Sequence, residues 1–241
     1  MDTGRAQLHA VPFFVKQWTV VLFVILKYLT WCTKLLNMKF LIASVLLLVS
    51  FSMNAQNADS VAAAQRRALL EKNKDRLIYP VVKGSVSTGV IPVTGVTEPV
   101  DPSLHYKILF DFTEGTAAQY KEGTVNPGLE EICRMVNLHY AAGIKKEKIQ
   151  IVIILHSAAV MTVINNDEFR KRFGRDNQNL DLIGQLEKLG TRFIVCGQTA
   201  TLREIPDASL LPGVKKAYSA RTALSTYNLK GFYSYVISGG H

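Results

Sequence analysis

Cysteine is scarce in this chain of 241 residues, which contains only Cys32, Cys133 and Cys196. No two of them form a CxxC pair, and three cysteines do not make the disulfide framework of a small secreted domain. The five histidines are scattered, and none has metal-ligand spacing to another histidine or to a cysteine. The sequence therefore gives no indication of a zinc site, and we expect no metal.

Nucleotide-binding fingerprints are missing as well. Neither GxGxxG nor the P-loop pattern GxxxxGKS/T follows the first predicted strand, so we expect no cofactor. The formal charge is +9, but residues 1–55 hold five basic side chains against one acidic one. The remaining 23 basic and 18 acidic residues form no stripe interleaved with aromatic residues. Nucleic acid is therefore not an expected partner.

Residues 38–55 have the pattern of a secretory signal peptide. Met38 and Lys39 precede an apolar run over residues 40–51, and Ala55 stands at the predicted cleavage point. The run is shorter than the roughly twenty apolar residues of a membrane span. We expect a periplasmic or secreted protein after cleavage.

Residues 1–37 lie upstream of that signal and contain a second apolar run at residues 18–26, flanked by Lys16 and Lys27. This run is either a short anchor, which would leave the protein attached to a membrane, or part of a start-site artefact. The artefact is favoured because a complete signal peptide begins at Met38. Membrane contact is expected only through the N-terminal segment.

Residues 56–104 differ in composition from the C-terminal part of the chain. Alanine, leucine, arginine and glutamate at helical spacing predict a polar helix over residues 58–77. Four prolines between residues 78 and 102 then argue against a central strand or a helix. We expect an extended arm that lies over the domain or over a partner; a plain linker is the alternative.

Residues 105–241 alternate strands with helices. Apolar runs predict strands at 106–112, 149–155, 193–196, 214–218 and 232–237, and helices are predicted at 126–142, 158–164, 166–173, 179–189, 199–205 and 219–229. Asn126 and Asn179 are the expected helix caps, and residues 113–125 are expected to form a loop. Such alternation is typical of right-handed βαβ units. The fold class is therefore α/β: a flavodoxin-like, doubly wound, mainly parallel five-stranded sheet with helices on both faces.

Several chemically active groups come directly after the predicted strands. The carboxyl ends of parallel strands share one edge, so that a thiolate site is expected there. Cys196 and His156 are the candidate catalytic residues, and a helix after Cys196 would favour the thiolate. The possible rim contacts are Glu114, Ser157, Gly197 and Gln198.

Each of these groups also has a simpler interpretation. Cys196 could be a small packing residue at a strand end, as Cys133 is expected to be on its helix. His156 could only satisfy a backbone carbonyl, and Glu114 could be a solvated loop carboxylate. A Cys133–Cys196 disulfide is a third possibility.

Four segments resemble the DsrE/DsrF-like (YchN-type) proteins, in their exported branch: Leu155-His-Ser-Ala-Ala-Val160, Asn166-Asp-Glu-Phe-Arg170, Asn177-Gln-Asn-Leu-Asp-Leu-Ile183 and Val195-Cys-Gly-Gln-Thr-Ala200. The resemblance implies a flavodoxin-like sheet, a homo-oligomer and a sulfur relay through a cysteine persulfide, with a sulfur donor or acceptor protein as partner. Cys196 matches the thiol of the family segment. Ser157 and the alanine after it stand where many relatives have glycines.

These observations support two hypotheses of function. The first is an exported sulfur-handling protein that carries or binds sulfane sulfur on Cys196, and is at most a sulfur carrier or transferase. The alternative is a non-catalytic oligomeric binding module whose cysteine is structural.

Overall fold

The computed structural model describes residues 64–238. The described residues belong to one compact unit, which spans residues 59–241. The predicted upstream segment (1–37) and signal peptide (38–55) lie outside the described residues. Within the described part, no helix is both long enough and apolar enough to cross a membrane.

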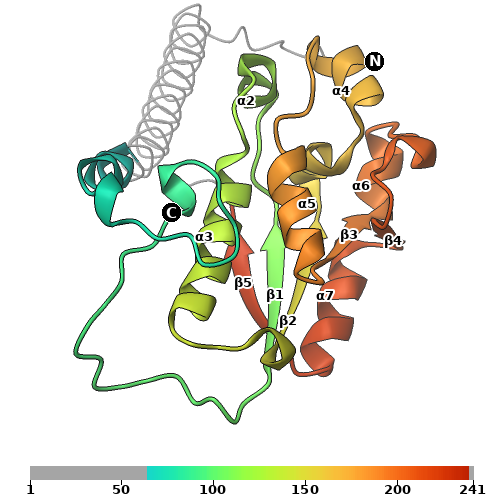
Figure 1. Ribbon diagram of the computed structural model, residues 1–241. Coiled ribbons are helices and arrows are strands. Elements are labelled where there is room, and N and C mark those ends of the chain that lie inside the picture. The colour runs from blue at the N-terminus through green and yellow to red at the C-terminus, as the bar shows by residue number, and fades with distance from the viewer. Residues whose placement is uncertain (1–63, 239–241) are drawn as a thin grey trace, which may run out of the picture. The chain divides into compact units, whose positions relative to one another are not determined.

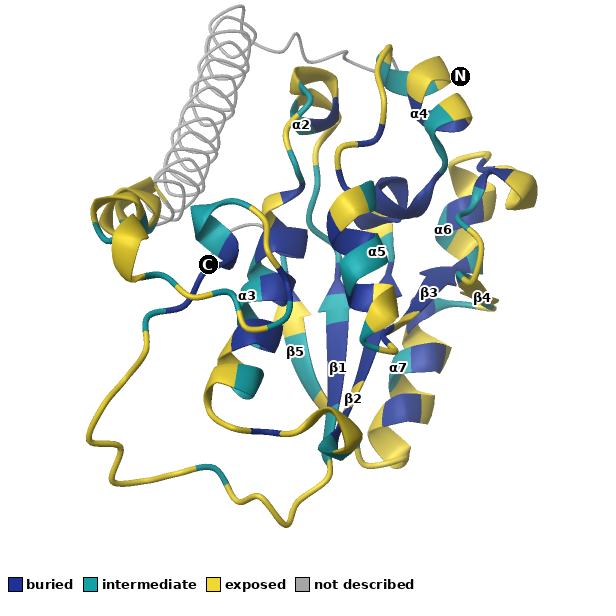
Figure 2. Cartoon of the chain, viewed as in Figure 1, coloured by how far each residue is buried: buried dark blue, intermediate teal, exposed yellow. Residues whose placement is uncertain are grey.

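Five parallel strands form one sheet in the order β4-β3-β2-β1-β5, which confirms the predicted fold class (Figure 1). The strands are β1 (Tyr106–Phe112), β2 (Ile149–Leu155), β3 (Arg192–Cys196), β4 (Lys215–Ala217) and β5 (Tyr233–Ile237). The central strands are the most deeply buried (Figure 2). A strand covered on both faces needs apolar side chains on both, which explains the nearly continuous apolar run of β2.

Helices cover both faces of the sheet, but unequally. The described helices are a segment at 64–72, α2 (Ala117–Glu122), α3 (Pro127–Ala141), α4 (Asn166–Phe173), α5 (Leu180–Lys188), α6 (Gly197–Leu202) and α7 (Ala220–Leu229). Short 3-10 turns are found at Lys74–Arg76, Val86–Thr88, Lys146–Lys148, Ser157–Val163 and Asp207–Ser209.

The strand order decides which helix lies on which face. The steps from β1 to β4 all run in one direction, and the connection from β4 to β5 returns across the sheet. Right-handed crossovers therefore place α3, α5 and α6 on one face and α7 on the other. Side chains of α3 and α5 belong to the larger core, and those of α7 to a smaller second core.

Two local predictions were wrong. The expected loop at 113–125 contains α2, which begins with a capping box between Thr116 and Gln119. Asn126 caps α3 as predicted, with Pro127 at the first helical position. Asn179 makes no side-chain cap for α5, because its Oδ1 accepts a hydrogen bond from the Asn126 N–H over 2.8 Å. The side chain holds two loops together instead.

The first part of the proline-rich arm packs on α3. Val82 and Thr88 are fully buried, and Ile78 and Val90 pair as an antiparallel bridge. Asn137 of α3 accepts hydrogen bonds from the N–H groups of residues 81 and 82 and donates to the carbonyls of residues 82 and 88. One buried amide thus anchors the arm to the domain.

Replacing that amide should be costly. We expect Asn137→Ala to lower the free energy of unfolding by about 2–4 kcal/mol, because buried backbone groups lose their partner. Chemical denaturation measures the change. Gln185→Ala is the matched control: its amide also bonds the backbone of Lys83, but in solvent, so its loss should stay below about 1 kcal/mol. Equal losses in the two variants would show that Asn137 is not the anchor.

Candidate functional site

Cys196 is the last residue of β3 and the N-cap residue of α6. Its side chain lies on the face of the sheet that α7 covers, in the smaller core with Ala220 and Ala223. Only 5% of the residue's surface is exposed. The thiol therefore lies at a strand-to-helix junction at the carboxyl edge of the sheet, where α/β proteins bind ligands.

Two helix N-termini meet at the Cys196 sulfur. The Thr199 N–H of α6 donates to Sγ over 3.4 Å, and the N–H groups of Gln198 and of Ala220, the first residue of α7, donate to it as well. Burial by itself would raise the pKa of the Cys196 thiol. These bonds, together with one from the Thr199 side chain, nevertheless hold that pKa below its ordinary value. The site thus favours the thiolate.

Gly197 makes this convergence of helices possible. A methyl group on its α-carbon would lie 2.6 Å from the backbone oxygen of Ala217 and 3.2 Å from that of Tyr218. The next residue, Gln198, donates its N–H to the Tyr218 oxygen over 3.3 Å. Only a residue without a side chain allows the start of α6 to approach the β4–α7 connection so closely. That approach brings the Ala220 N–H to the thiol.

A histidine–carboxylate pair lies on the same face. His156 Nε2 is 2.6 Å from Asp111 Oδ1, and the two side chains are 28% and 21% exposed. Asp111 belongs to β1, and His156 comes after β2 in extended conformation, with its N–H bonded to the Phe112 oxygen. The carboxylate fixes the orientation of the imidazole ring. The Nδ1 atom has no hydrogen-bond partner among the described residues.

Strand register relates this pair to the thiol. Leu155 of β2 pairs with Val195 of β3, so the next residues along the two strands are His156 and Cys196. Side chains at equivalent positions of neighbouring parallel strands project from the same face of the sheet. The structure thus gathers an acid, an imidazole and a thiol along one row at the carboxyl edge.

Asp111 was missed by the sequence reasoning. Its one signal in the sequence was an acidic residue inside an otherwise apolar strand, at a position whose neighbours on both sides are buried phenylalanines.

Ser157 comes after the histidine with a positive φ of 55°, a conformation that glycine adopts without strain. This explains why a glycine would suit the position, and the residue turns the chain away from the sheet after His156.

Glu114 lies elsewhere, against the start of α3 on the opposite face. A methyl group on Gly128 would be 2.7 Å from Glu114 Oε2. Glu114 also lines a cavity of about 610 Å³ that is bounded by the helix at 64–72, the beginning of α3 and the end of β5. The structure therefore does not bring Glu114 together with Cys196 and His156.

Cys133 is fully buried in the larger core, on the α3 face of the sheet, whereas Cys196 belongs to the smaller core on the other face. Both thiols are free. The sheet separates them, so the possible Cys133–Cys196 disulfide was wrong. Burial, followed by the charge of Glu130, raises the pKa of the Cys133 thiol, which stays protonated as a core residue.

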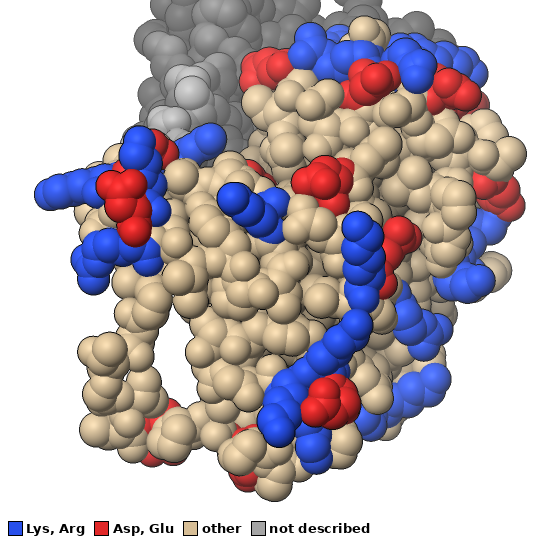
Figure 3. Space-filling view, in the orientation of Figure 1, with Lys and Arg blue, Asp and Glu red and all other residues tan. Residues whose placement is uncertain are grey.

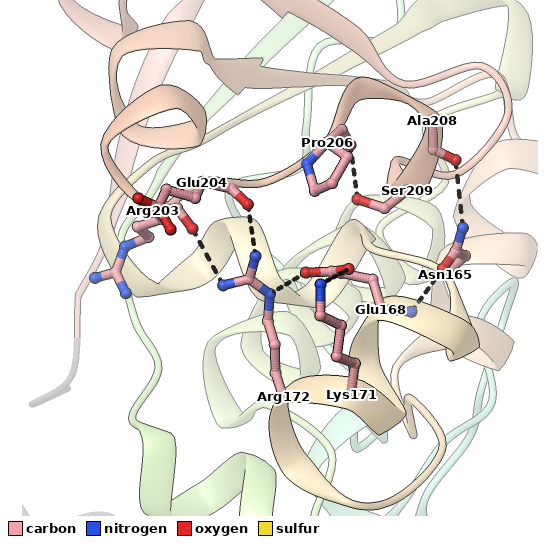
Figure 4. A network of polar contacts seen from close by, with 9 residues as sticks. All are labelled: Asn165, Glu168, Lys171, Arg172, Arg203, Glu204, Pro206, Ala208 and Ser209. Atoms are coloured by element: carbon pink, nitrogen blue, oxygen red, sulfur yellow. Dashed lines mark hydrogen bonds and ion pairs between the residues drawn. The ribbon is translucent and has the colours of Figure 1, made fainter.

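The far end of α6 is held by Arg172 of α4. Its guanidinium donates to the backbone oxygens of Arg203 and Glu204 over 3.1 and 2.8 Å, and to Glu168 Oε1 over 2.5 Å (Figure 4). Helix α6 is thus fixed at both ends. Among residues 64–238 no cluster of three or more metal-binding side chains occurs.

The close contact at Gly197 leads to a testable difference between two glycines. Gly197→Ala should lower the free energy of unfolding by about 1–3 kcal/mol, because the new methyl meets backbone that cannot move aside freely. Gly184→Ala, in α5, meets nothing within 4 Å and should raise it by about 0.5–1 kcal/mol. Thermal or urea unfolding compares the two. If Gly197→Ala left the free energy of unfolding unchanged, the close approach of α6 to the β4–α7 connection would be refuted.

The model of the DsrE/DsrF-like family matches residues 107–235. Among solved structures, the chain is similar to the protein of unknown function MTH1491 from Methanobacterium thermoautotrophicum, with 18% identity and a TM-score of 0.39 over 54% of this chain and 98% of that chain. No curated protein matches the sequence.

The matched residues make up more than half of the chain, reach from β1 to β5, and include Asp111, His156 and Cys196. The chain is a member of the DsrE/DsrF-like family.

Proposed function

We propose that this protein carries sulfane sulfur as a persulfide on Cys196. The observation that carries the proposal is the thiol itself, which accepts hydrogen bonds from the N-termini of two helices and has a lowered pKa. A thiolate is the form of cysteine that attacks sulfur. Membership of a family associated with sulfur relay supports the same chemistry.

Cys196 would receive its sulfur atom by an exchange reaction with a donor persulfide. The Cys196 thiolate attacks the outer sulfur of a donor R–S–SH, a new S–S bond forms on Cys196, and the donor's S–S bond breaks. The electron pair of that bond leaves with RS⁻, and the proton of the donor stays on the new persulfide. Transfer to an acceptor thiolate is the same exchange in reverse, so that neither an oxidant nor a reductant is needed.

His156 would donate a proton to the leaving group RS⁻. With Nε2–H directed at Asp111, Nδ1 is the nitrogen left to exchange a proton with RS⁻ or with an acceptor thiol. Asp111 stabilises the protonated ring without itself changing protonation. Asp111 is therefore a positioning residue in this proposal, and His156 a proton donor and acceptor.

The alternative function, a binding module with a structural cysteine, is favoured by one observation. Only 5% of Cys196 is exposed, which is the exposure of a packed residue. A structural thiol would react slowly in the folded protein and rapidly only after denaturation.

Mass spectrometry tests the persulfide directly. After incubation of the full chain with polysulfide and digestion without reductant, the peptide containing Cys196 should gain one sulfur atom. The peptide containing buried Cys133 is the internal control and should gain none. His156→Gln should slow loading by about tenfold or more without removing the acceptor thiol. The proposal fails if wild-type Cys196 gains no sulfur, or if Cys196→Ser leaves the total gain unchanged.

The pH dependence of thiol labelling tests the electrostatics separately. Because the pKa of Cys196 is lowered, its thiolate persists as the pH falls, and the rate of iodoacetamide labelling should reach half its plateau at a lower pH than the labelling of a free cysteine does. Thr199→Ala removes the side-chain hydrogen bond and should move this midpoint upward.

Thr201→Ala is the matched control, since Thr201 is exposed on the same short helix. Labelling that appears only in denaturant would support the structural alternative instead.

A further inference from the structure

The amino-terminal edge of the sheet, opposite the thiol, is strongly basic. Every strand of the sheet begins beside lysine or arginine residues, and those at the starts of β1, β2, β3 and β5 are called the basic edge here: Lys107, Lys145, Lys146, Lys148, Lys188, Arg192 and Lys230. Basic side chains, with some acidic ones among them, lie across the lower centre and lower right of the molecule in Figure 3, and the strands begin at the lower centre in Figure 1. The strand order alone brings these residues, which are far apart in sequence, to one end of the domain.

Contacts join members of the basic edge in two groups. Lys107 Nζ donates to the backbone oxygen of Lys230 over 3.0 Å, and Lys230 and Arg192 both lie over the ring of Tyr227, at 5.4 and 5.6 Å. On the other side, Lys146 Nζ donates to the oxygen of Lys188 over 3.2 Å.

Lys148 lies next to the start of β1, because its Nζ is 3.4 Å from both the Ser103 oxygen and His105 Nε2. The acidic residues of this end are Asp101, Glu147 and Glu187. Seven basic residues against three acidic ones leave a net charge of about +4, which attracts anionic surfaces.

Large apolar side chains project beside these charges. Leu229 precedes Lys230 and is 90% exposed, Tyr233 at the start of β5 is 67% exposed, and Leu104 before β1 is 54% exposed. Exposed apolar surface rimmed by polar residues is typical of contact sites on proteins or membranes.

We propose that the basic edge docks on an anionic lipid surface. Lysine side chains reach the headgroup region while their stems lie along apolar surface, and an exposed leucine or tyrosine inserts between the headgroups. The edge has six lysines and one arginine, whereas reading of bases in nucleic acid relies largely on arginine forks. The combination of lysine charge with aliphatic side chains therefore fits a membrane better than a nucleic acid.

Docking in this way would orient the site. The seven residues of β2, at about 3.3 Å each, separate the two edges by roughly 20 Å. Cys196 would then face away from the lipid and toward a soluble donor or acceptor. This contact belongs to the folded domain and is additional to the membrane contact expected of the N-terminal segment.

Vesicle sedimentation with the full chain tests the proposal. Wild-type protein should bind vesicles of phosphatidylglycerol and phosphatidylcholine more tightly than vesicles of phosphatidylcholine alone, and less tightly as salt rises. The triple variant Lys146→Glu, Lys188→Glu, Lys230→Glu should lose about a hundredfold in affinity for the anionic vesicles. Leu229→Ser should weaken binding to the same vesicles about threefold to tenfold.

A matched triple variant shows whether the loss of vesicle binding comes from the basic edge or only from the change in net charge. Lys72→Glu, Lys121→Glu and Lys171→Glu change the same number of exposed charges on the helix at 64–72, α2 and α4, and should keep binding within about threefold. The N-terminal segment is common to all variants, so its contribution cancels in the ratios. Equal losses in the two triple variants would overturn the proposal. The proposal would also be overturned if the protein bound duplex DNA through the edge lysines and did not bind vesicles.

Discussion

The parallel pairing of β2 with β1 on one side and β3 on the other is the constraint on which the site depends. It aligns the carboxyl ends of three strands and gives them a common face, so that Asp111, His156 and Cys196 lie along one row. A shift by one residue in either register would turn the imidazole or the thiol to the opposite face. The buried apolar side chains of β2 oppose such a shift, because both faces of that strand are covered. Core packing and site geometry therefore have the same origin.

The same sheet also distinguishes the two cysteines of the domain. Cys133 belongs to α3, and there burial and the charges of Glu130 and Asp181 raise the pKa of its thiol more than a backbone hydrogen bond lowers it. Cys196 is also largely buried, but it receives hydrogen bonds from α6 and α7, and these outweigh desolvation. The difference depends on Gly197, which lets the start of α6 approach the segment that leads into α7. Burial alone does not decide the reactivity of a thiol; the donors around it do.

The two edges of the sheet have different characters. Strands end at the row of reactive groups and begin among lysines and exposed apolar side chains, so the proposed sulfur chemistry and the proposed lipid contact lie at opposite ends of the domain. Neither group of residues is contiguous in sequence. A parallel sheet produces both groups at once, since every strand contributes its first residues to one edge and its last residues to the other.

The sequence by itself determined the elements and the fold class. The apolar runs marked the five strands, and Asn126 with Pro127 marked the start of α3, because these signals are local. Helix α2 was missed because glycine and threonine around Thr116 indicated a loop, and Asn179 was misassigned because its partner is 53 residues away.

The sequence also singled out Cys196 and His156, which come directly at or after strand ends. Only the tertiary structure decided that Asp111, not Glu114, faces His156, and that Cys133 and Cys196 are on opposite sides of the sheet. Those facts depend on strand order and on which face each side chain takes, and both are set by contacts between residues far apart in the chain.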